Sequence, residues 1–400
     1  MMPLKQAVLG RKGLEKIPGR HPWFFRGDFD RLPMEEQNGA LIPVTTPKGS
    51  VLGWGLFSPG ASLCVRILSW KAERPDLERL FEKRVQEAEK RRRPFLGKGE
   101  DAYRWVHGEA DGLPGLVVDR YGPVVVVQTL CAGMYRSLDI LAKVLAGYPG
   151  VDALVLRNEA KYLENEGIPR EKKLLYGKLP ANIPFPVRAG EIKSLVDPFK
   201  GQKTGLYLDV RKAPNLIQPL CPGARVLDAF SYTGNFSIHA LHWGASEILA
   251  LDQSAEALGV AKDNLELNGF RESGNVVLEE CNVFDRLKEL DERKRSFDLV
   301  IMDPPPFAPS RKQLEGARRG YKELAVRSLK MTAEGGSVLF FSCSQAFGRE
   351  VLLDVLSEAA RDVKRECRVM AEFHQPQDHP VSLNFPESDY LKGFLLEVQA

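Results

Sequence analysis

Apolar residues in the second half of the chain form short strand-like runs that alternate with longer stretches of helical spacing. Strands and helices that alternate in this way predict a parallel sheet covered by helices on both faces. At the end of the chain, two strands follow each other without a helix, which predicts an antiparallel hairpin that closes the sheet. The predicted strands are 225–228, 247–252, 275–279, 299–302, 337–342, 368–373 and 391–398, and the predicted helices are 236–242, 255–267, 316–330 and 349–360.

The first half has a different texture, with short β-like runs at 41–44, 51–57 and 63–68 that Gly and Pro interrupt. A charged helix is predicted over 73–93. We interpret its basic end, Lys90 to Arg93, as a solvated helix end, with contact to RNA phosphates as the alternative. Strand-like runs at 115–119, 124–130 and 152–156 surround a helical stretch at 135–145, which predicts an α+β unit.

The pattern as a whole predicts an α/β protein with three domains: a small β-rich domain over 1–72, a central α+β domain with its linking helix over 73–188, and the parallel-sheet domain over 189–400. A chain of 400 residues exceeds the size of one typical core, which agrees with several domains.

Net charge, cysteine spacing and the absence of long apolar runs indicate which classes of protein the sequence fits. The net charge of +3 neither requires nor excludes a polyanionic partner. Six cysteines lie far apart without a CxxC pair or a histidine cluster, so we expect no metal site and no disulfide framework. No apolar run approaches the ~20 residues of a membrane span, and no signal segment opens the chain. We expect a cytoplasmic protein without a membrane partner.

The segment from Arg225 to Phe236 carries the first chemical signal. Asp228 ends an apolar strand, and Gly234 allows a ligand to approach the backbone before a helix begins. The segment lacks GxGxxG spacing, which argues against a dinucleotide and favours an adenosyl ligand without phosphates. Asp252 ends the next strand, where its carboxylate could accept both ribose hydroxyls. The alternative for Asp252 is a helix N-cap.

Two further strand ends suggest chemistry on a base. The run from Asp303 to Phe307 contains three prolines, which stiffen the loop, and ends in an aromatic ring that could stack on an extruded base. Cys343 ends another strand at the same predicted edge, where a thiolate could act as a nucleophile. The remaining cysteines are predicted to be inert core residues: Cys64, Cys131, Cys221, Cys281 and Cys367.

These segments resemble a known family. Residues 228–236, 303–307 and 342–344 are similar to motifs I, IV and VI of class I S-adenosylmethionine-dependent methyltransferases. With 201–211, 318–322 and 378–393, they resemble the bacterial ribosomal RNA large-subunit cytosine-C5 methyltransferases. Residues 19–25 are similar to the start of that family's PUA RNA-binding domain, and 111–119 to its central domain. The resemblance implies a Rossmann-like methyltransferase domain after a PUA-like and a central domain.

The resemblance also implies roles for individual residues. Cys343 attacks C6 of cytosine, and Asp303 binds the N3 and amino edge of the base. A second cysteine that assists release in other RNA cytosine methyltransferases is missing from the 303–306 loop, so the releasing group is unidentified. Either Asn282 or Asp285 contacts the adenine amino group. The implied cofactor residues are Lys203, Thr204, Tyr207, Arg211, Asp228, Phe230, Thr233, Gly234, Asn235, Asp252 and Asn282, and the implied base-binding residues are Pro304, Pro305, Phe307, Arg318 and Tyr321.

A mixed basic and aromatic cluster near the N-terminus is predicted to supply RNA affinity, because cations meet phosphates and rings stack on bases. The alternative is that the aromatic residues are core, which we favour for Phe24 and Phe25. The cluster comprises Arg11, Lys12, Arg20, His21, Trp23 and Arg26.

The leading hypothesis is an S-adenosylmethionine-dependent enzyme that makes 5-methylcytosine in ribosomal RNA, with 23S RNA as the expected partner and a homodimer allowed. One alternative is a methyltransferase for a guanine or adenine nitrogen, which needs no carbon nucleophile such as Cys343. The other is a noncatalytic RNA-binding protein.

Overall fold

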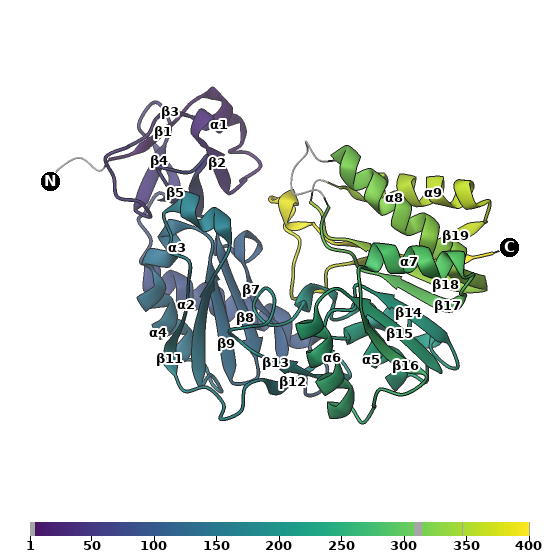
Figure 1. Cartoon of the computed structure of the whole chain (residues 1–400). Coiled ribbons are helices and arrows are strands. Elements are labelled where there is room, and N and C mark those ends of the chain that lie inside the picture. The colour runs from purple at the N-terminus through teal and green to yellow at the C-terminus, as the bar shows by residue number, and fades with distance from the viewer. Residues whose placement is uncertain (1–4, 308–313, 346, 400) are drawn as a thin grey trace. The chain divides into compact units, whose positions relative to one another are not determined.

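The computed structural model describes residues 5–307, 314–345 and 347–399, and it divides into two compact units (Figure 1). Unit 1 comprises Met1–Val187, Val196–Leu208 and Gln377–Ser388. Unit 2 comprises Arg188–Leu195, Asp209–Pro376 and Asp389–Ala400. Unit 1 therefore includes one segment from near the end of the chain. Within the described ranges, no helix is both long and apolar enough to cross a membrane.

The N-terminal part of unit 1 is the predicted β-rich module. Its six-stranded sheet has the order β2-β6-β5-β4-β1-β3 and buries a core that includes Phe24 and Phe57. Phe24 is core as predicted, but the same prediction is wrong for Phe25, which is 41% exposed. The elements are β1 (Ala7–Leu9), α1 (Arg11–Glu15), β2 (Trp23–Phe25), η1 (Arg26–Asp28), β3 (Phe29–Arg31), β4 (Leu41–Thr45), β5 (Val51–Phe57) and β6 (Leu63–Ser69).

The central part of unit 1 is a five-stranded sheet with the order β11-β10-β9-β8-β7, whose core contains Phe81 of α2 and Trp105 of β7. The predicted helix 135–145 is two helices that meet at Ser137. The outer strands β7 and β11 were not predicted, because β7 carries Arg104 and β11 is polar and largely exposed. The elements are α2 (Leu77–Arg92), η2 (Arg93–Phe95), β7 (Ala102–His107), η3 (Gly108–Asp111), β8 (Leu116–Tyr121), β9 (Val124–Thr129), α3 (Ala132–Arg136), α4 (Leu138–Ala146), β10 (Ala153–Asn158), η4 (Lys161–Glu166) and β11 (Glu171–Gly177).

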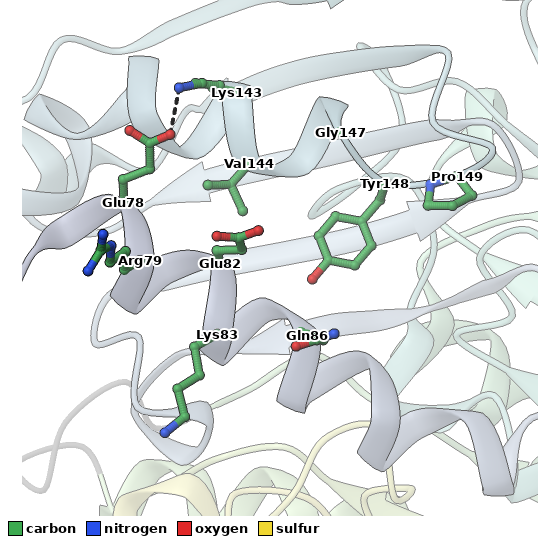
Figure 2. Close-up of a pocket in the computed structure, with 10 residues that line it drawn as sticks. All are labelled: Glu78, Arg79, Glu82, Lys83, Gln86, Lys143, Val144, Gly147, Tyr148 and Pro149. Carbon is green, nitrogen blue, oxygen red and sulfur yellow. Dashed lines mark hydrogen bonds and ion pairs between the residues drawn. The ribbon is translucent and has the colours of Figure 1, made fainter.

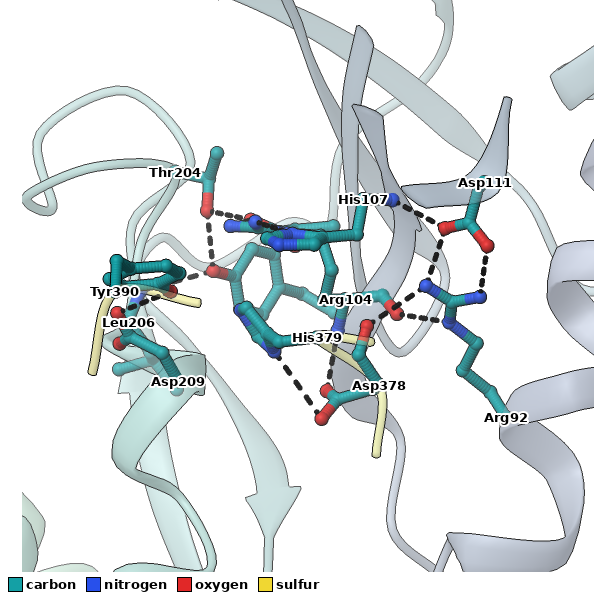
Figure 3. A network of polar contacts seen from close by, with 12 residues as sticks. Arg92, Arg104, His107, Asp111, Thr204, Leu206, Asp209, Asp378, His379 and Tyr390 are labelled. Carbon is teal, nitrogen blue, oxygen red and sulfur yellow. Dashed lines mark hydrogen bonds and ion pairs between the residues drawn. The ribbon is translucent and has the colours of Figure 1, made fainter. Parts of the chain in front are cut away.

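The prediction of a solvated basic end for α2 is wrong at Arg92. The Arg92 guanidinium is fully buried and donates to both carboxylate oxygens of Asp111, at 2.6 and 2.5 Å (Figure 3). It also donates to the carbonyl of Asp378 at 2.9 Å, from the late segment of unit 1. A buried cation needs such partners, because an unpaired charge in the interior is costly.

Unit 2 contains the predicted parallel sheet, with the order β16-β15-β14-β17-β18-β20-β19. Leu227 and Ala229 of β14 join a core with α7, α8 and α9, whereas Asp228 points to the other face and bonds Ser237 of α5. Helices therefore cover both faces, as predicted. The elements are β14 (Arg225–Ala229), α5 (Asn235–His242), β15 (Glu247–Asp252), α6 (Ala255–Leu267), β16 (Val276–Glu280), α7 (Val283–Glu292), β17 (Phe297–Met302), α8 (Leu314–Met331), β18 (Thr332–Ser342), α9 (Arg349–Val363), β19 (Cys367–His374) and β20 (Lys392–Val398).

The last two strands form the predicted antiparallel pair, but β20 lies between β18 and β19 and pairs antiparallel with both. Its first residue, Lys392, is opposite Ser342 at the end of β18. The remaining short elements are the hairpin strands β12 (Phe185–Ala189) and β13 (Ile192–Val196) and the turns η5 (Leu208–Val210), η6 (Ala213–Leu216), η7 (Gln218–Leu220) and η9 (Pro386–Ser388).

Candidate functional site

Five predicted site residues lie at or just after the carboxyl ends of five neighbouring strands in unit 2. In spatial order they are Asn282 after β16, Asp252 on β15, Asp228 on β14, Asp303 after β17 and Cys343 after β18. The chain order reverses between β14 and β17, and ligands of open α/β sheets bind at such a switch point. The strand order thus places all five residues at one edge of the sheet. The candidate cofactor residues lie on the β16–β15–β14 side, and the candidate catalytic residues Asp303 and Cys343 lie on the β17–β18 side.

The loop after β14 has a strained backbone. Phe230 and Tyr232 have φ angles of 65° and 48°, and Gly234 has a φ of 81°. Left-handed conformations at non-glycine residues cost free energy and are concentrated at ligand sites. At Gly234 a Cβ would lie 3.3 Å from that of Ala261, so both the φ angle and the packing favour glycine. The loop leads directly into α5, which no side chain caps.

Asp228 is buried beneath this loop, with one carboxylate oxygen satisfied and one not. Oδ2 accepts hydrogen bonds from the backbone N–H of Ser237 at 3.1 Å and from its hydroxyl at 2.6 Å. Among the described residues, neither Asp228 Oδ1 nor the buried hydroxyl of Ser231 has a hydrogen-bond partner. Burial raises the pKa of Asp228 to about 6. Unsatisfied buried polar atoms are rare, so this pair fits a site that a polar ligand such as S-adenosylmethionine completes.

Asp252 is half-buried at the end of β15 and holds the two loops beside it. Its Oδ2 accepts from the N–H of Tyr232 and its Oδ1 from the N–H of Ser254, both at 2.9 Å. The N-cap alternative is wrong for Asp252, because Ser254 caps α6 through its bond to the N–H of Ala257. Each carboxylate oxygen keeps a second lone pair, so the ribose contacts stay a prediction.

Asn282 is the N-cap of α7. Its side-chain oxygen accepts from the N–H groups of Phe284 and Asp285, at 3.0 and 3.4 Å. An adenine amino group needs an acceptor, and this oxygen already serves two donors. Asp285 is exposed on the first turn of the same helix, so its carboxylate is the stronger candidate for the adenine contact.

The loop after β17 begins at Asp303, whose N–H donates to the carbonyl of Ala229 at 3.5 Å. Pro304 is buried and Pro305 is exposed. The half-buried ring of Phe307 lies between two other rings, with centroid distances of 5.9 Å to Phe284 and 4.7 Å to Tyr321. These contacts hold Phe307 from two sides, and stacking of its ring on a base stays a prediction.

Tyr321 is fully buried, so its ring has no free face for a base. Its hydroxyl hydrogen-bonds to the hydroxyls of Ser342 and Ser344, at 2.9 and 3.2 Å, on either side of Cys343. Tyr321 therefore supports Phe307 and the Cys343 turn. The sequence suggested a contact with the substrate and did not suggest this supporting role.

The other implied residues are divided between the units. Lys203, Thr204 and Tyr207 belong to unit 1, where the buried Thr204 hydroxyl bonds to Asp119 and to Tyr121 at 2.8 Å. The Lys203 ammonium lies 4.4 Å from the centroid of the Tyr207 ring. Contact of these three with a cofactor stays a prediction. Arg211 is buried in unit 2, and the carbonyl of Thr233 accepts a hydrogen bond from the side-chain amide of Asn264. Asn235 begins α5, and Arg318 pairs with Glu358 at 2.5 Å.

The N-terminal cluster does not form one free surface. Arg11 is exposed on α1 beside Glu15, and Arg20 is exposed on the following turn. His21 bonds Glu387 at 3.1 Å, and the indole N–H of Trp23 donates to Glu109 at 2.7 Å. Trp23 also packs on Phe385, with ring centroids 4.6 Å apart. His21 and Trp23 thus have partners inside unit 1, whereas the exposed arginines remain candidates for phosphates.

A cavity of about 480 Å³ in unit 1 is lined by none of the predicted site residues (Figure 2). It is bordered by the charged face of α2 and the end of α4, with the ring of Tyr148 on one side. Lys143 and Glu78 form an exposed ion pair at its rim. The lining contains no cysteine and no strand-end carboxylate, so we do not assign the chemistry to it.

Comparison with known proteins agrees with this geometry. Residues 187–388 match an S-adenosylmethionine-dependent methyltransferase family model, and residues 8–70 match a PUA-like domain. Proteins named ribosomal RNA large subunit methyltransferase I are 37% identical in Shewanella denitrificans, covering 95% of this chain and 96% of the relative, and 35% identical in Escherichia coli, covering 97% and 98%.

Solved structures show the same fold. A Streptococcus mutans protein described as a candidate SAM-dependent methyltransferase has a TM-score of 0.83 at 21% identity, over 98% of this chain and 100% of that chain. A structure of SMU.776 with the same scores is a complex with SAH. The family model and the named relatives show that the noncatalytic alternative is wrong. The chain is an S-adenosylmethionine-dependent methyltransferase and belongs to the ribosomal RNA large subunit methyltransferase I family.

Proposed function

We propose that this enzyme methylates C5 of a cytosine in large-subunit ribosomal RNA through a covalent adduct with Cys343. The observation that carries the proposal is the adjacency of two strand ends. Cys343 follows β18 and Asp303 follows β17, and these strands pair in parallel next to β14 and its cofactor loop. The names of the relatives support a ribosomal RNA substrate.

S-adenosylmethionine supplies an electrophilic methyl group, and the chain's own residues prepare the base to receive it. The Cys343 sulfur forms a bond to C6, which moves electron density to C5. Asp303 binds the N3 and amino edge of the base and stabilises its protonated form. After C5 has accepted the methyl group, a base removes the C5 proton and the C6–sulfur bond breaks, which returns the thiolate.

The other elements orient the substrate. Phe307 presents a ring that stacks on the base, and the Pro304–Pro305 backbone stiffens the loop below it. The exposed basic residues of the N-terminal module contact RNA phosphates and set affinity rather than chemistry. In this assignment Tyr321 acts through Phe307 and the Cys343 turn.

The test uses RNA that carries 5-fluorocytidine at the target position. Fluorine cannot leave as a proton, so wild-type enzyme should remain covalently attached to this RNA. Cys343→Ala should neither trap the RNA nor methylate it, while it keeps its fold and binds S-adenosylmethionine. Cys281→Ala is the matched control, because burial raises the pKa of that thiol to about 11. A fully active Cys343→Ala enzyme would disprove the C5 reaction and favour methylation of a ring or amino nitrogen.

A further inference from the structure

Lys392 is a buried cation next to the Cys343 turn. Its side chain is 5% exposed, and it lies at the start of β20, directly opposite Ser342 in the antiparallel register. Its ammonium group donates to the carbonyls of Ser344 at 3.2 Å and Tyr390 at 3.0 Å. These two bonds place the positive charge at the turn that presents Cys343.

The partners of Lys392 are unusual for a buried cation in this chain. Arg66, Arg92 and Arg104 are also buried, and each forms an ion pair with a buried carboxylate. The hydrogen bonds of the Lys392 ammonium, in contrast, go to two neutral carbonyls. Two neutral carbonyls compensate only part of the free-energy cost of burying the ammonium charge. The Lys392 charge would therefore stabilise an anion next to it.

Several charged and titratable groups lie on the elements around Lys392. Asp389 is exposed on the preceding loop, and His374, opposite on β19, is exposed and lies 4.0 Å from Glu372. The Tyr321 phenol bonds Ser342 and Ser344, and Asp303 ends the neighbouring strand β17. Burial lowers the pKa of Lys392, whereas Asp389 and, to a smaller extent, Cys343 raise it. Solvent screens the charge of the exposed Asp389, whereas the strand register and the bond to the Ser344 carbonyl place the ammonium at the turn that carries Cys343.

We infer that Lys392 is a positioning residue that holds the nucleophile as a thiolate through a buried ammonium–thiolate interaction. The inference rests on the proposed role of Cys343 and adds the group that makes its sulfur reactive at neutral pH. The nucleophile is the thiolate and not the thiol, so the fraction of thiolate sets the rate of attack on C6. No proton needs to leave Lys392 for this role.

The experiment measures the pH dependence of alkylation of Cys343 by iodoacetamide in the full chain without RNA. Trypsin releases Cys343 in the peptide 331–349 and Cys281 in the peptide 272–286, so mass spectrometry follows both thiols separately. The variants are Lys392→Met, Lys392→Arg as the conservative replacement, and Lys288→Met as an exposed control on α7 of unit 2. Thermal melting and binding of S-adenosylmethionine check the fold of each variant.

In wild type, the midpoint of Cys343 alkylation should lie below the ~8.5 of a free thiol. Lys392→Met should move the midpoint up by about one pH unit, which is roughly tenfold slower alkylation at pH 7. Lys392→Arg should restore most of the rate, and Lys288→Met and the Cys281 peptide should not change. An unchanged midpoint in a folded Lys392→Met protein would overturn the inference. If that variant does not fold, a wild-type midpoint at or above that of a free thiol overturns it instead.

Trapping with 5-fluorocytidine separates this inference from the proposed function. The midpoint of Cys343 alkylation could be low and depend on Lys392 while the enzyme forms no RNA adduct. This result would support the ammonium–thiolate interaction and reject the covalent mechanism. If the RNA adduct forms but Lys392→Met leaves the midpoint of alkylation unchanged, the covalent mechanism stands and the role of Lys392 is rejected.

Discussion

Asp228 allows a quantitative prediction, because it combines complete burial with one satisfied and one unsatisfied oxygen. Burial disfavours the charged carboxylate, the two bonds from Ser237 favour it, and the charge of Asp252 disfavours it. The result is a pKa raised from 3.8 to about 6. We expect Asp228→Asn to remove a destabilising charge from the unliganded protein and at the same time to weaken cofactor binding.

The size of the effect follows from proton linkage. The unfolded carboxyl loses its proton near pH 3.8 and the folded one near pH 6, so between these values the folded state binds more protons. The free energy of unfolding therefore falls as the pH rises through this window. A pKa difference of about 2 units corresponds to roughly 3 kcal/mol, fully expressed above pH 7, and about half of it is already present at pH 5.

Urea unfolding at pH 5 and pH 8 tests this pH dependence of the free energy of unfolding. The amide in Asp228→Asn does not titrate, so its own effect on stability is the same at both pH values and cancels in the comparison. Relative to Asp228→Asn, wild type should lose roughly 1.5 kcal/mol between the two pH values. Hydrogen exchange in the peptides of β14 and α5 should report the same difference locally. Calorimetry should show that wild type binds S-adenosylmethionine more weakly below pH 6, and that Asp228→Asn binds weakly at every pH. Parallel stability profiles for the two proteins would refute the reasoning.

Four other substitutions test three separate parts of the molecule. Asp252→Ala should weaken S-adenosylmethionine binding by on the order of 1.5–3 kcal/mol in calorimetry, as for hydrogen bonds to a charged group; an unchanged dissociation constant would contradict the ribose contacts. Arg92→Met should lower the free energy of unfolding by about 3–5 kcal/mol, because it leaves Asp111 buried with a weaker partner, whereas Arg91→Met, at a half-exposed position, should cost less than about 1 kcal/mol. Arg11→Glu should raise the RNA concentration for half-maximal methylation and leave cofactor affinity unchanged; normal RNA dependence would assign α1 another purpose.

Local sequence patterns were sufficient for most of unit 2. The bounds of β15 and α6 are those predicted, because apolar strands and amphipathic helices alternate there with clear turn residues. Helix α7 was missed, although Val283, Leu287 and Leu290 have helical spacing and Asn282 is a good N-cap. The signal for this helix is therefore present in the sequence.

Contacts between distant parts of the chain could not be predicted in this way. The basic end of α2 has the composition of a solvated face, and only the fold brings Asp111 and Asp378 to Arg92. Trp23 is likewise of a residue type that stacks on RNA bases. Its indole N–H instead donates to Glu109, and its ring packs on Phe385. In both cases the partner comes from another element, and no spacing in the sequence encodes the pairing.

The same reasoning explains why Cys343 was recognisable and Lys392 was not. A parallel neighbour brings its carboxyl end to the same edge, so β17 places Asp303 beside the end of β18, and alternation of strands and helices predicts this pairing. An antiparallel neighbour brings its first residue there instead. Because β20 lies between β18 and β19, its first residue Lys392 is opposite Ser342. The order of the last two strands therefore decides which residue lies opposite Ser342, next to the proposed nucleophile, and that order depends on tertiary packing that the hydrophobic pattern does not contain.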